Sequence, residues 1–234
     1  MASITALTIQ STLGVRKVVE LDPGTVTETL ECLAEDVRFD AIKVGMLGNG
    51  AVAAVVMAWL EGQKNVPVVL DPVMKSSSGK DLLDFEGCEI LRQGGLVRAN
   101  WITPNLAELA VLTGRPIPQK SEETEKVALD LYQTAARRGN PTLKLVVTGG
   151  HAKTPDDLLV MDGICRWFPG ERVVTNSTHG TGCAFSSALA ARVALGDEPS
   201  EAVAHAKHYV TGALRHAYPI GAGDGPLNHY WEKT

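Results

Sequence analysis

Short apolar runs rich in β-branched residues alternate with segments of helical spacing over the first two thirds of the chain. The apolar runs predict strands at residues 3–10, 41–47, 67–71, 100–103 and 143–150. The helical segments lie between them, at about residues 25–37, 49–63, 105–113 and 121–139. Runs such as Val68–Leu70 are apolar on both faces, as strands of a parallel sheet covered by helices must be. The pattern therefore predicts a three-layer α/β/α fold with a mostly parallel central sheet.

The pattern changes in the last third of the chain. Residues 158–174 contain short apolar segments separated by Asp162-Gly163 and by Pro169-Gly170, which predicts a meander or hairpin at the edge of the sheet. Two helices at about 181–195 and 199–217 follow, and a glycine-rich loop ends the chain. Because no internal repeat or low-complexity linker interrupts the sequence, we expect a single domain over residues 1–234.

Composition narrows the classes of partner. The chain has 22 Lys and Arg against 27 Asp and Glu, a net charge of −5, and no basic run that would attract nucleic acid. A small-molecule partner is therefore expected. The four cysteines form no CxxC pair, which argues against a zinc site or a disulfide framework. With no membrane-length apolar run and no signal sequence, the expected location is the cytoplasm, away from membranes.

Candidate site residues follow the predicted strands, because ligands of open parallel sheets bind at the carboxyl ends of the strands. Asp71 follows one apolar run and precedes a proline, so it is either a cleft carboxylate or a turn residue. Asn105 and Glu108 open the next helix together. They are either site residues or an N-cap and its capping-box partner.

A second candidate lies where Gly180-Thr181-Gly182-Cys183 opens a helix. Consecutive backbone N–H groups and the positive end of the helix favour an anion there. The structural alternative is a glycine-rich N-cap with the hydroxyl of Thr178 or Thr181 as the cap. An anion site together with two carboxylates suited to Mg²⁺ indicates phosphoryl transfer. The P-loop pattern GxxxxGK(S/T) is absent, and no GxGxxG follows a first strand, so P-loop kinases and dinucleotide-binding enzymes are disfavoured.

Five segments resemble the hydroxymethylpyrimidine and phosphomethylpyrimidine kinases of thiamin biosynthesis, which belong to the ribokinase-like superfamily. They are DPVMKSSSGKDLL (71–83), ITPNLAELAVLTG (102–114), VVTGGH (146–151), STHGTGCAFSSALAA (177–191) and GPLNHYW (225–231). Pyridoxal kinases, which are close relatives, usually carry aspartate where Cys183 stands. The resemblance implies a ribokinase-like fold and ATP- and Mg²⁺-dependent phosphorylation of 4-amino-5-hydroxymethyl-2-methylpyrimidine, then of its monophosphate. A homodimer is implied by analogy.

The resemblance also implies roles for individual residues. The pyrimidine would contact Gln10, Met46 and Val73, and magnesium would be organised by Asp71 and Glu108. The nucleotide would lie near Asn105, Thr148 and Lys207. The anion hole for the phosphoryl group would be formed by Gly180, Thr181, Gly182 and Cys183. Cys183 would be the base for the substrate hydroxyl in the first phosphorylation. A helix start lowers the pKa of a thiol below its usual value of about 8.5, so some thiolate is expected at neutral pH.

The sequence departs from the family pattern at two places. The family usually has lysine at the position of Thr148. It also usually begins with a further strand and a glycine-rich segment, whereas this chain begins almost inside residues 3–10. A buried parallel strand there would lack its neighbour, so we expect an N-terminally truncated fold. An internal methionine taken as the start, a shortened chain and a natural short form would each explain it.

Two alternative functions remain open at this point. One is a pyridoxal- or pyridoxine-type vitamin kinase, because the two groups of enzymes overlap in substrate. The other is a poorly catalytic protein that binds the pyrimidine or the nucleotide.

Overall fold

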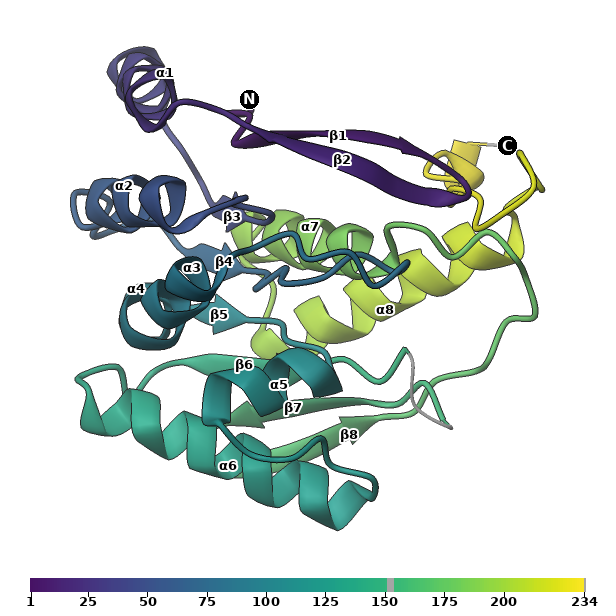
Figure 1. Ribbon diagram of the computed structural model, residues 1–234. Coiled ribbons are helices and arrows are strands. Elements are labelled where there is room, and N and C mark those ends of the chain that lie inside the picture. Colours follow the sequence, from purple (N-terminus) through teal and green to yellow (C-terminus); the bar gives the residue numbers. More distant parts are fainter. Residues whose placement is uncertain (151–153, 234) are drawn as a thin grey trace.

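The computed structural model describes residues 1–150 and 154–233, and a six-stranded sheet lies at its centre (Figure 1). The strands stand in the order β3 (Ile42–Val44), β4 (Val68–Leu70), β5 (Trp101–Ile102), β6 (Lys144–Val147), β7 (Asp157–Met161) and β8 (Ile164–Phe168). The first four are mutually parallel, while β7 runs antiparallel to both of its neighbours, β6 and β8. Asp162 and Gly163 join the last two strands with φ of 54° and 74°, as a type I′ turn requires. The predicted meander or hairpin at the sheet's edge is confirmed around Asp162-Gly163, whereas residues 169–174, at and after the second predicted turn, form no strand.

Alternate residues of the central strands pack into two separate hydrophobic cores, one on each face of the sheet. Leu70 and Ile102 pack with α2 (Gly50–Leu60), α5 (Leu106–Thr113) and α6 (Ser121–Arg137). Val69 and Trp101 point to the opposite face and pack with α7 (Thr181–Ala194) and α8 (Pro199–Arg215). Since successive side chains of a strand point to opposite faces, a strand buried on both sides must be apolar throughout. The helices therefore cover both faces of the sheet (Figure 1), and the predicted α/β/α layers are confirmed.

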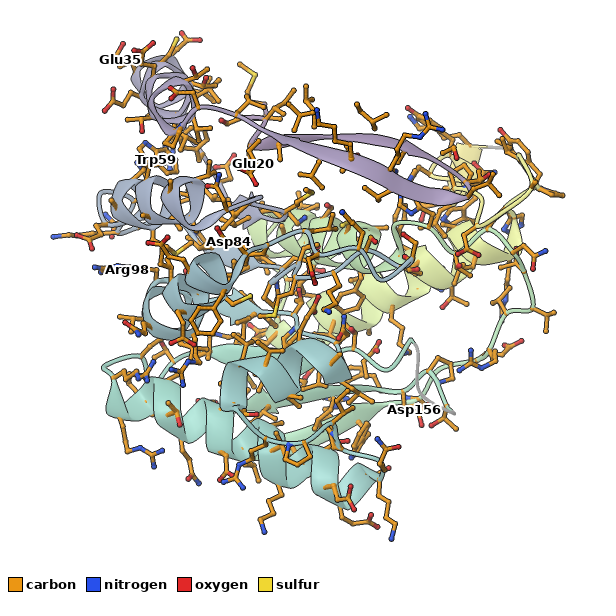
Figure 2. The ribbon with its side chains drawn as sticks, in the orientation of Figure 1. Glu20, Glu35, Trp59, Asp84, Arg98 and Asp156 are labelled. Atoms are coloured by element: carbon orange, nitrogen blue, oxygen red, sulfur yellow. The ribbon has the colours of Figure 1, made fainter. Side chains whose placement is uncertain are left out.

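One helical segment escaped prediction. It comprises α3 (Phe85–Ile90), a single π-helical turn η1 (Leu91–Gly95) and α4 (Leu96–Arg98); Figure 2 labels Asp84 and Arg98, which bracket it. The Asp84 carboxylate caps α3 by accepting from the N–H of Gly87 at 2.7 Å. Glycines obscure the helical pattern, but Gly95 has a packing reason: an added Cβ would lie 2.7 Å from Leu70 Cδ2 in β4.

The strand expected at residues 3–10 does not belong to the central sheet. Instead β1 (Ala6–Ser11) pairs antiparallel with β2 (Gly14–Glu20) in a separate hairpin, and β2 was not predicted. The expectation of a buried parallel strand without its neighbour is therefore wrong. Leu7 and Ile9 alternate with polar residues, but it is this apolar face that is exposed, at 52% and 51%, the reverse of the usual hydrophobic-in, polar-out alternation.

A few polar contacts attach the hairpin to the rest of the chain. Glu20, labelled in Figure 2 at the end of β2, accepts from Asn49 Nδ2 at 2.7 Å, and the Thr5 hydroxyl donates to the carbonyl of Met46 at 2.6 Å. The chain then enters α1 (Pro23–Asp36), which packs on α2. In the part of the chain that the structure describes, no helix is long and apolar enough to cross a membrane.

Candidate active site

The carboxyl ends of β3 and β4 meet the first turns of α5 and α7 around a buried carboxylate, Asp71. This residue follows β4 directly and is only 5% exposed. Ser186, in the second turn of α7, donates its hydroxyl to Asp71 Oδ2 at 2.8 Å. The ammonium of Lys43 in β3 lies 3.6 Å from the same oxygen. Burial raises the pKa of Asp71, while Lys43 and Ser186 act in the opposite direction.

The first turn of α7 is open toward this cluster. Gly180 precedes the helix with φ of 82°, a left-handed conformation that glycine adopts without strain, and no side chain caps the helix. The Thr181 hydroxyl donates backward to the carbonyl of Thr178 instead. The structural alternative is therefore right about a glycine N-cap, since Gly180 holds that position, and wrong about a capping hydroxyl from Thr178 or Thr181. The N–H of Thr181 donates to the carbonyl of Thr178 at 3.4 Å. The N–H groups of Gly182 and Cys183 have no partner within the helix, so they face outward toward an anion.

The thiol of Cys183 differs from expectation. Its side chain reaches solvent, but protein atoms crowd the sulfur, and the resulting desolvation raises its pKa. The nearby carboxylate of Asp71 raises it further, while Lys43 opposes both effects only in part. The expected lowering by the helix start is wrong, because burial and a like charge outweigh the helix field. The pKa of Cys183 thus lies above the usual thiol range, which disfavours the thiolate.

The first turn of α5 is closed by its own side chains. Asn105 Oδ1 accepts from the N–H groups of Ala107 and Glu108, each at 2.9 Å, and Glu108 Oε2 accepts from the N–H of Asn105 at 2.9 Å. This reciprocal pattern is the capping box that the sequence offered as one alternative. Burial, and secondarily the charge of Asp71, raises the pKa of Glu108 from 4.5 to about 8.

The two carboxylates fit a water-mediated magnesium ion. Asp71 and Glu108 are both buried, and the charge of Asp71 disfavours ionisation of Glu108, an effect that a nearby divalent cation would relieve. Within residues 1–150 and 154–233 no group of three or more His, Cys, Asp or Glu side chains could hold a metal ion by itself. Magnesium usually keeps several waters and binds through one or two carboxylates plus phosphates, so a pair of carboxylates suffices.

The residues expected near a nucleotide lie at the ends of β5 and β6. The N–H of Thr148 donates to the carbonyl of Pro104 at 2.9 Å, and Asn105 stands beside Thr148 in an isolated bridge. The ammonium of Lys207 on α8 donates to Asp157 Oδ2 and to the carbonyl of Pro155, both at 2.7 Å. Asp157 Oδ1 in turn accepts from the N–H of Gly149 at 2.9 Å, so Lys207 braces this loop through Asp157. His151, part of the VVTGGH motif, lies outside the described residues.

The residues expected near a pyrimidine lie near the tip of the hairpin (Gln10) and past β3 and β4 (Met46 and Val73). Gln10 Nε2 in β1 lies 3.0 Å from His179 Nε2, in the loop that leads into α7. Gln10 and His179 also line a cavity of about 40 Å³ beneath the hairpin tip. Met46 and Val73 are both half-buried after their strands, and the N–H of Val73 donates to the carbonyl of Asp71 at 2.8 Å.

Three polar residues of this region were missed by the sequence reasoning. Lys43 carried one signal, a charge inside the apolar run AIKVGML. Ser186 lies among small helical residues, and nothing in the sequence distinguishes it from Ser187. His179 lies within the quoted THGTGC motif but was assigned no role. All three contacts join residues far apart in the chain, which periodicity does not reveal.

The fold is that of the ribokinase-like kinases. The chain is similar to Bacillus subtilis pyridoxal kinase, solved with ADP, at a TM-score of 0.87 and 26% identity over all of this chain and 86% of that one. It is also similar to the phosphomethylpyrimidine kinase of Clostridium difficile, at a TM-score of 0.76 and 31% identity over 92% of this chain and 86% of that one. Residues 1–228 match the phosphomethylpyrimidine kinase family, and the chain belongs to that family.

Curated relatives fall into two groups by length. The chain is 36% identical to a thiamine biosynthesis bifunctional protein, ThiED, of Geobacter sulfurreducens, over 97% of this chain but 45% of that protein. It is 34% identical to the hydroxymethylpyrimidine/phosphomethylpyrimidine kinase of Bacillus subtilis, over 98% of this chain and 83% of the relative. The chain thus spans less than half of the longer relative and most of the shorter one.

Proposed function

We propose that residues 1–234 form a single kinase domain that phosphorylates 4-amino-5-hydroxymethyl-2-methylpyrimidine with ATP, and then its monophosphate. The family match over residues 1–228 carries this proposal, and the open start of α7 beside Asp71 and Glu108 supports it. In the first step the substrate hydroxyl oxygen bonds to the γ-phosphorus, the bond from that phosphorus to ADP breaks, and the hydroxyl proton leaves. Catalysis of this kind depends mainly on positioning and on neutralising charge.

Each side chain has a part in the proposed reaction. The N–H groups of Gly182 and Cys183 receive the transferring phosphoryl group after the turn at Gly180. Asp71 and Glu108 would hold a magnesium ion, which would supply neutralisation of phosphate charge. The nucleotide lies over Asn105 and Thr148, with Lys207 fixing the loop beneath it through Asp157. Gln10, Met46 and Val73 contact the pyrimidine.

Cys183 is the proposed acceptor of the hydroxyl proton. Its raised pKa disfavours the thiolate, so it acts as a base only once its own proton has passed to a neighbour such as Asp71, which accepts a hydrogen bond from the thiol. The second phosphorylation has a phosphate as acceptor and needs no such step. We therefore expect Cys183→Ala to slow the first phosphorylation more than the second. Equal losses with the two acceptors, assayed separately, would remove Cys183 from the role of base.

A pyridoxal-type vitamin kinase is the second candidate. The pyridoxal kinase of Bacillus subtilis superposes on this chain at a TM-score of 0.87, and a Staphylococcus aureus pyridoxal kinase solved with AMP-PCP and pyridoxal does so at 0.83. Sequence identity is higher for the pyrimidine kinases, at 34% for the Bacillus subtilis enzyme against 26% for both pyridoxal kinases. We therefore prefer the hydroxymethylpyrimidine kinase activity over the pyridoxal kinase activity.

The deciding experiment measures ADP formation with the pyrimidine alcohol, its monophosphate and pyridoxal, alone and in competition. We expect the pyrimidine alcohol to be phosphorylated at least about tenfold more efficiently than pyridoxal, a difference of about 1.4 kcal/mol in transition-state stabilisation. The reverse order would favour the pyridoxal reading. Binding of the pyrimidine without ATP consumption would favour the poorly catalytic alternative.

The proposed location is the cytoplasm and the proposed assembly is a homodimer. All four cysteines are free thiols, which suits a reducing compartment. Leu7, Ile9 and Val19 share one face of the hairpin and are 52%, 51% and 37% exposed, so a second copy has an apolar face to cover. Light scattering of the purified protein tests the assembly: we expect a dimer that Leu7→Ser/Ile9→Ser dissociates, and a monomeric parent would exclude it.

A further inference from the structure

A second cavity lies among η1, α4, α5 and α6, on the face of the sheet opposite α7 and α8. Its volume is about 290 Å³. The lining includes four arginines, Arg92, Arg115, Arg137 and Arg138, and one carboxylate, Asp130. The whole chain has more acidic than basic residues, 27 against 22, so this concentration of positive charge is local. None of these residues belongs to the cluster around Asp71.

The four arginines differ in whether a carboxylate pairs with their guanidinium groups. Arg115 pairs with Asp130 at 2.5 Å, and Arg92 pairs with Glu89 at 2.7 Å. Arg137 reaches only the Thr134 hydroxyl of its own helix, at 3.1 Å, and Arg138 donates to the carbonyl of Arg92 at 2.7 Å. Among the described residues, neither Arg137 nor Arg138 forms an ion pair. Two guanidinium groups at one cavity therefore keep donors for a ligand.

Stabilisation of α6 by positive charge at its end explains only two of the four arginines at the cavity. Cations at the end of α6 stabilise the helix through its dipole, which explains the positions of Arg137 and Arg138. It does not explain why Arg92 and Arg115, from two other segments, line the same cavity. Arg92 also sits in the π-helical turn, and such turns are frequent at functional sites. Its Nε–H is buried without a hydrogen-bond partner in the described structure.

We propose that this cavity binds a small anion with two or more negative charges, of the class of phosphate esters and pyrophosphate. The planar guanidinium group matches phosphate oxygens in a two-pronged arrangement that lysine does not provide. A cavity of about 290 Å³ is close to the lower end of the usual range for small-ligand sites, roughly 300 Å³. The site is separate from the proposed kinase reaction, and its binding does not depend on that activity.

Pyrophosphate is the probe that tests the site. Hydrogen–deuterium exchange locates the binding, because the start of α7 would attract the same anion. In the parent protein we expect pyrophosphate to slow exchange in peptides covering residues 91–98 and 130–140. Arg137→Gln/Arg138→Gln should abolish that protection and weaken the local affinity by about tenfold or more. Arg137→Gln alone should weaken it by about threefold, and it keeps every contact of Arg138.

The control removes two exposed positive charges elsewhere. Lys64→Gln/Lys126→Gln should leave protection of the two peptides unchanged. The proposal fails if pyrophosphate does not slow exchange there in the parent, if the arginine variants retain the parent's affinity within about twofold, or if the lysine control loses as much. Protection confined to residues 177–191 would mean that only the α7 site binds the anion. Kinase assays decide the proposed function separately, because they use the other site.

Discussion

The starts of α5 and α7 lie beside the same buried aspartate but are completed in opposite ways. The first backbone N–H groups of each helix have no hydrogen-bond acceptor within that helix. In α5 the side chains of Asn105 and Glu108 satisfy them, whereas α7 begins with Gly180 and no side-chain cap. α6 and α8 also lack side-chain caps, so the missing cap alone does not distinguish α7. What distinguishes it is the combination of glycines and neighbouring Asp71, Lys43 and Cys183. A capped start stabilises its helix, and we infer that the open start of α7, beside charged groups, is the one that binds a ligand.

The sharpest test of this contrast is Gly182→Ala. A Cβ at Gly182 meets nothing within 4 Å, so alanine fits the empty protein and should favour the helix by up to about 1 kcal/mol. The same methyl group would intrude on a phosphoryl group at the open turn. We expect the melting temperature to hold or rise while kcat/KM falls by about 100-fold.

A matched alanine at the start of α8 serves as the control. Ser200→Ala alters another helix start without a side-chain cap and should leave activity unchanged. Full activity in Gly182→Ala would mean that the start of α7 is structural, like that of α5.

Ser186→Ala is expected to have the next largest effect. The Ser186 hydroxyl is fully buried and donates to Asp71 at 2.8 Å, so its removal leaves a buried carboxylate with one donor fewer. We expect kcat to fall by about tenfold and the magnesium requirement to rise, while KM for the pyrimidine changes little. The exposed neighbour Ser187 provides the control, because Ser187→Ala should be neutral. Parallel losses in both variants would point to a general weakening of α7.

At α5 the expected change is in stability. Asn105→Ala removes the acceptor of two N–H groups and should lower the free energy of unfolding by about 1 to 2 kcal/mol in urea titrations. Asn105→Asp keeps an acceptor at the same place and should retain most of that stability. If Asn105→Asp raises KM for ATP without loss of stability, Asn105 also contacts the nucleotide. An unchanged stability in Asn105→Ala would show that the cap contributes nothing measurable.

The smallest effect concerns the pH dependence of stability. Glu108 holds its proton more tightly in the folded protein, with a pKa of about 8 against 4.5 for the ordinary side chain. The folded state therefore carries an extra proton between those values, and stability falls as pH rises through that window. We expect a loss of about 1 kcal/mol between pH 7 and pH 8 from this group. Glu108→Gln should flatten that part of the curve, and an unchanged slope would exclude Glu108 as its source.

The pattern of hydrophobic positions along the chain predicted the layered fold. It failed where the pairing of a strand depends on residues far away in the sequence. The apolar runs at Val68–Leu70 and Lys144–Val147 identify central strands because burial on both faces leaves no alternation. Residues 3–10 were assigned to the same sheet because they are β-branched, although their alternation suits an exposed hairpin. The segment α3 to α4 was missed because its glycines weaken the helical signal.

The site was predictable to the extent that it follows strand ends and helix starts. Asp71, Glu108 and the turn before Cys183 were found in this way. Ser186 and Lys43 were not, because each acquires its contact with Asp71 only when α7 and β3 meet β4. The state of the Cys183 thiol was mispredicted for the same reason: the helix start is visible in the sequence, and the neighbouring carboxylate is not.

The weak attachment of the β1–β2 hairpin determines which part of the molecule unfolds first. Its side chains contribute nothing to the central cores, and a handful of polar contacts, among them Asn49 with Glu20 and Gln10 with His179, attach it. Segments with so little buried apolar area detach at a fraction of the global unfolding energy. A protease should therefore cut residues 1–22 first and leave the layered body intact. If two copies bury this face against each other, that cleavage should slow as the protein concentration rises.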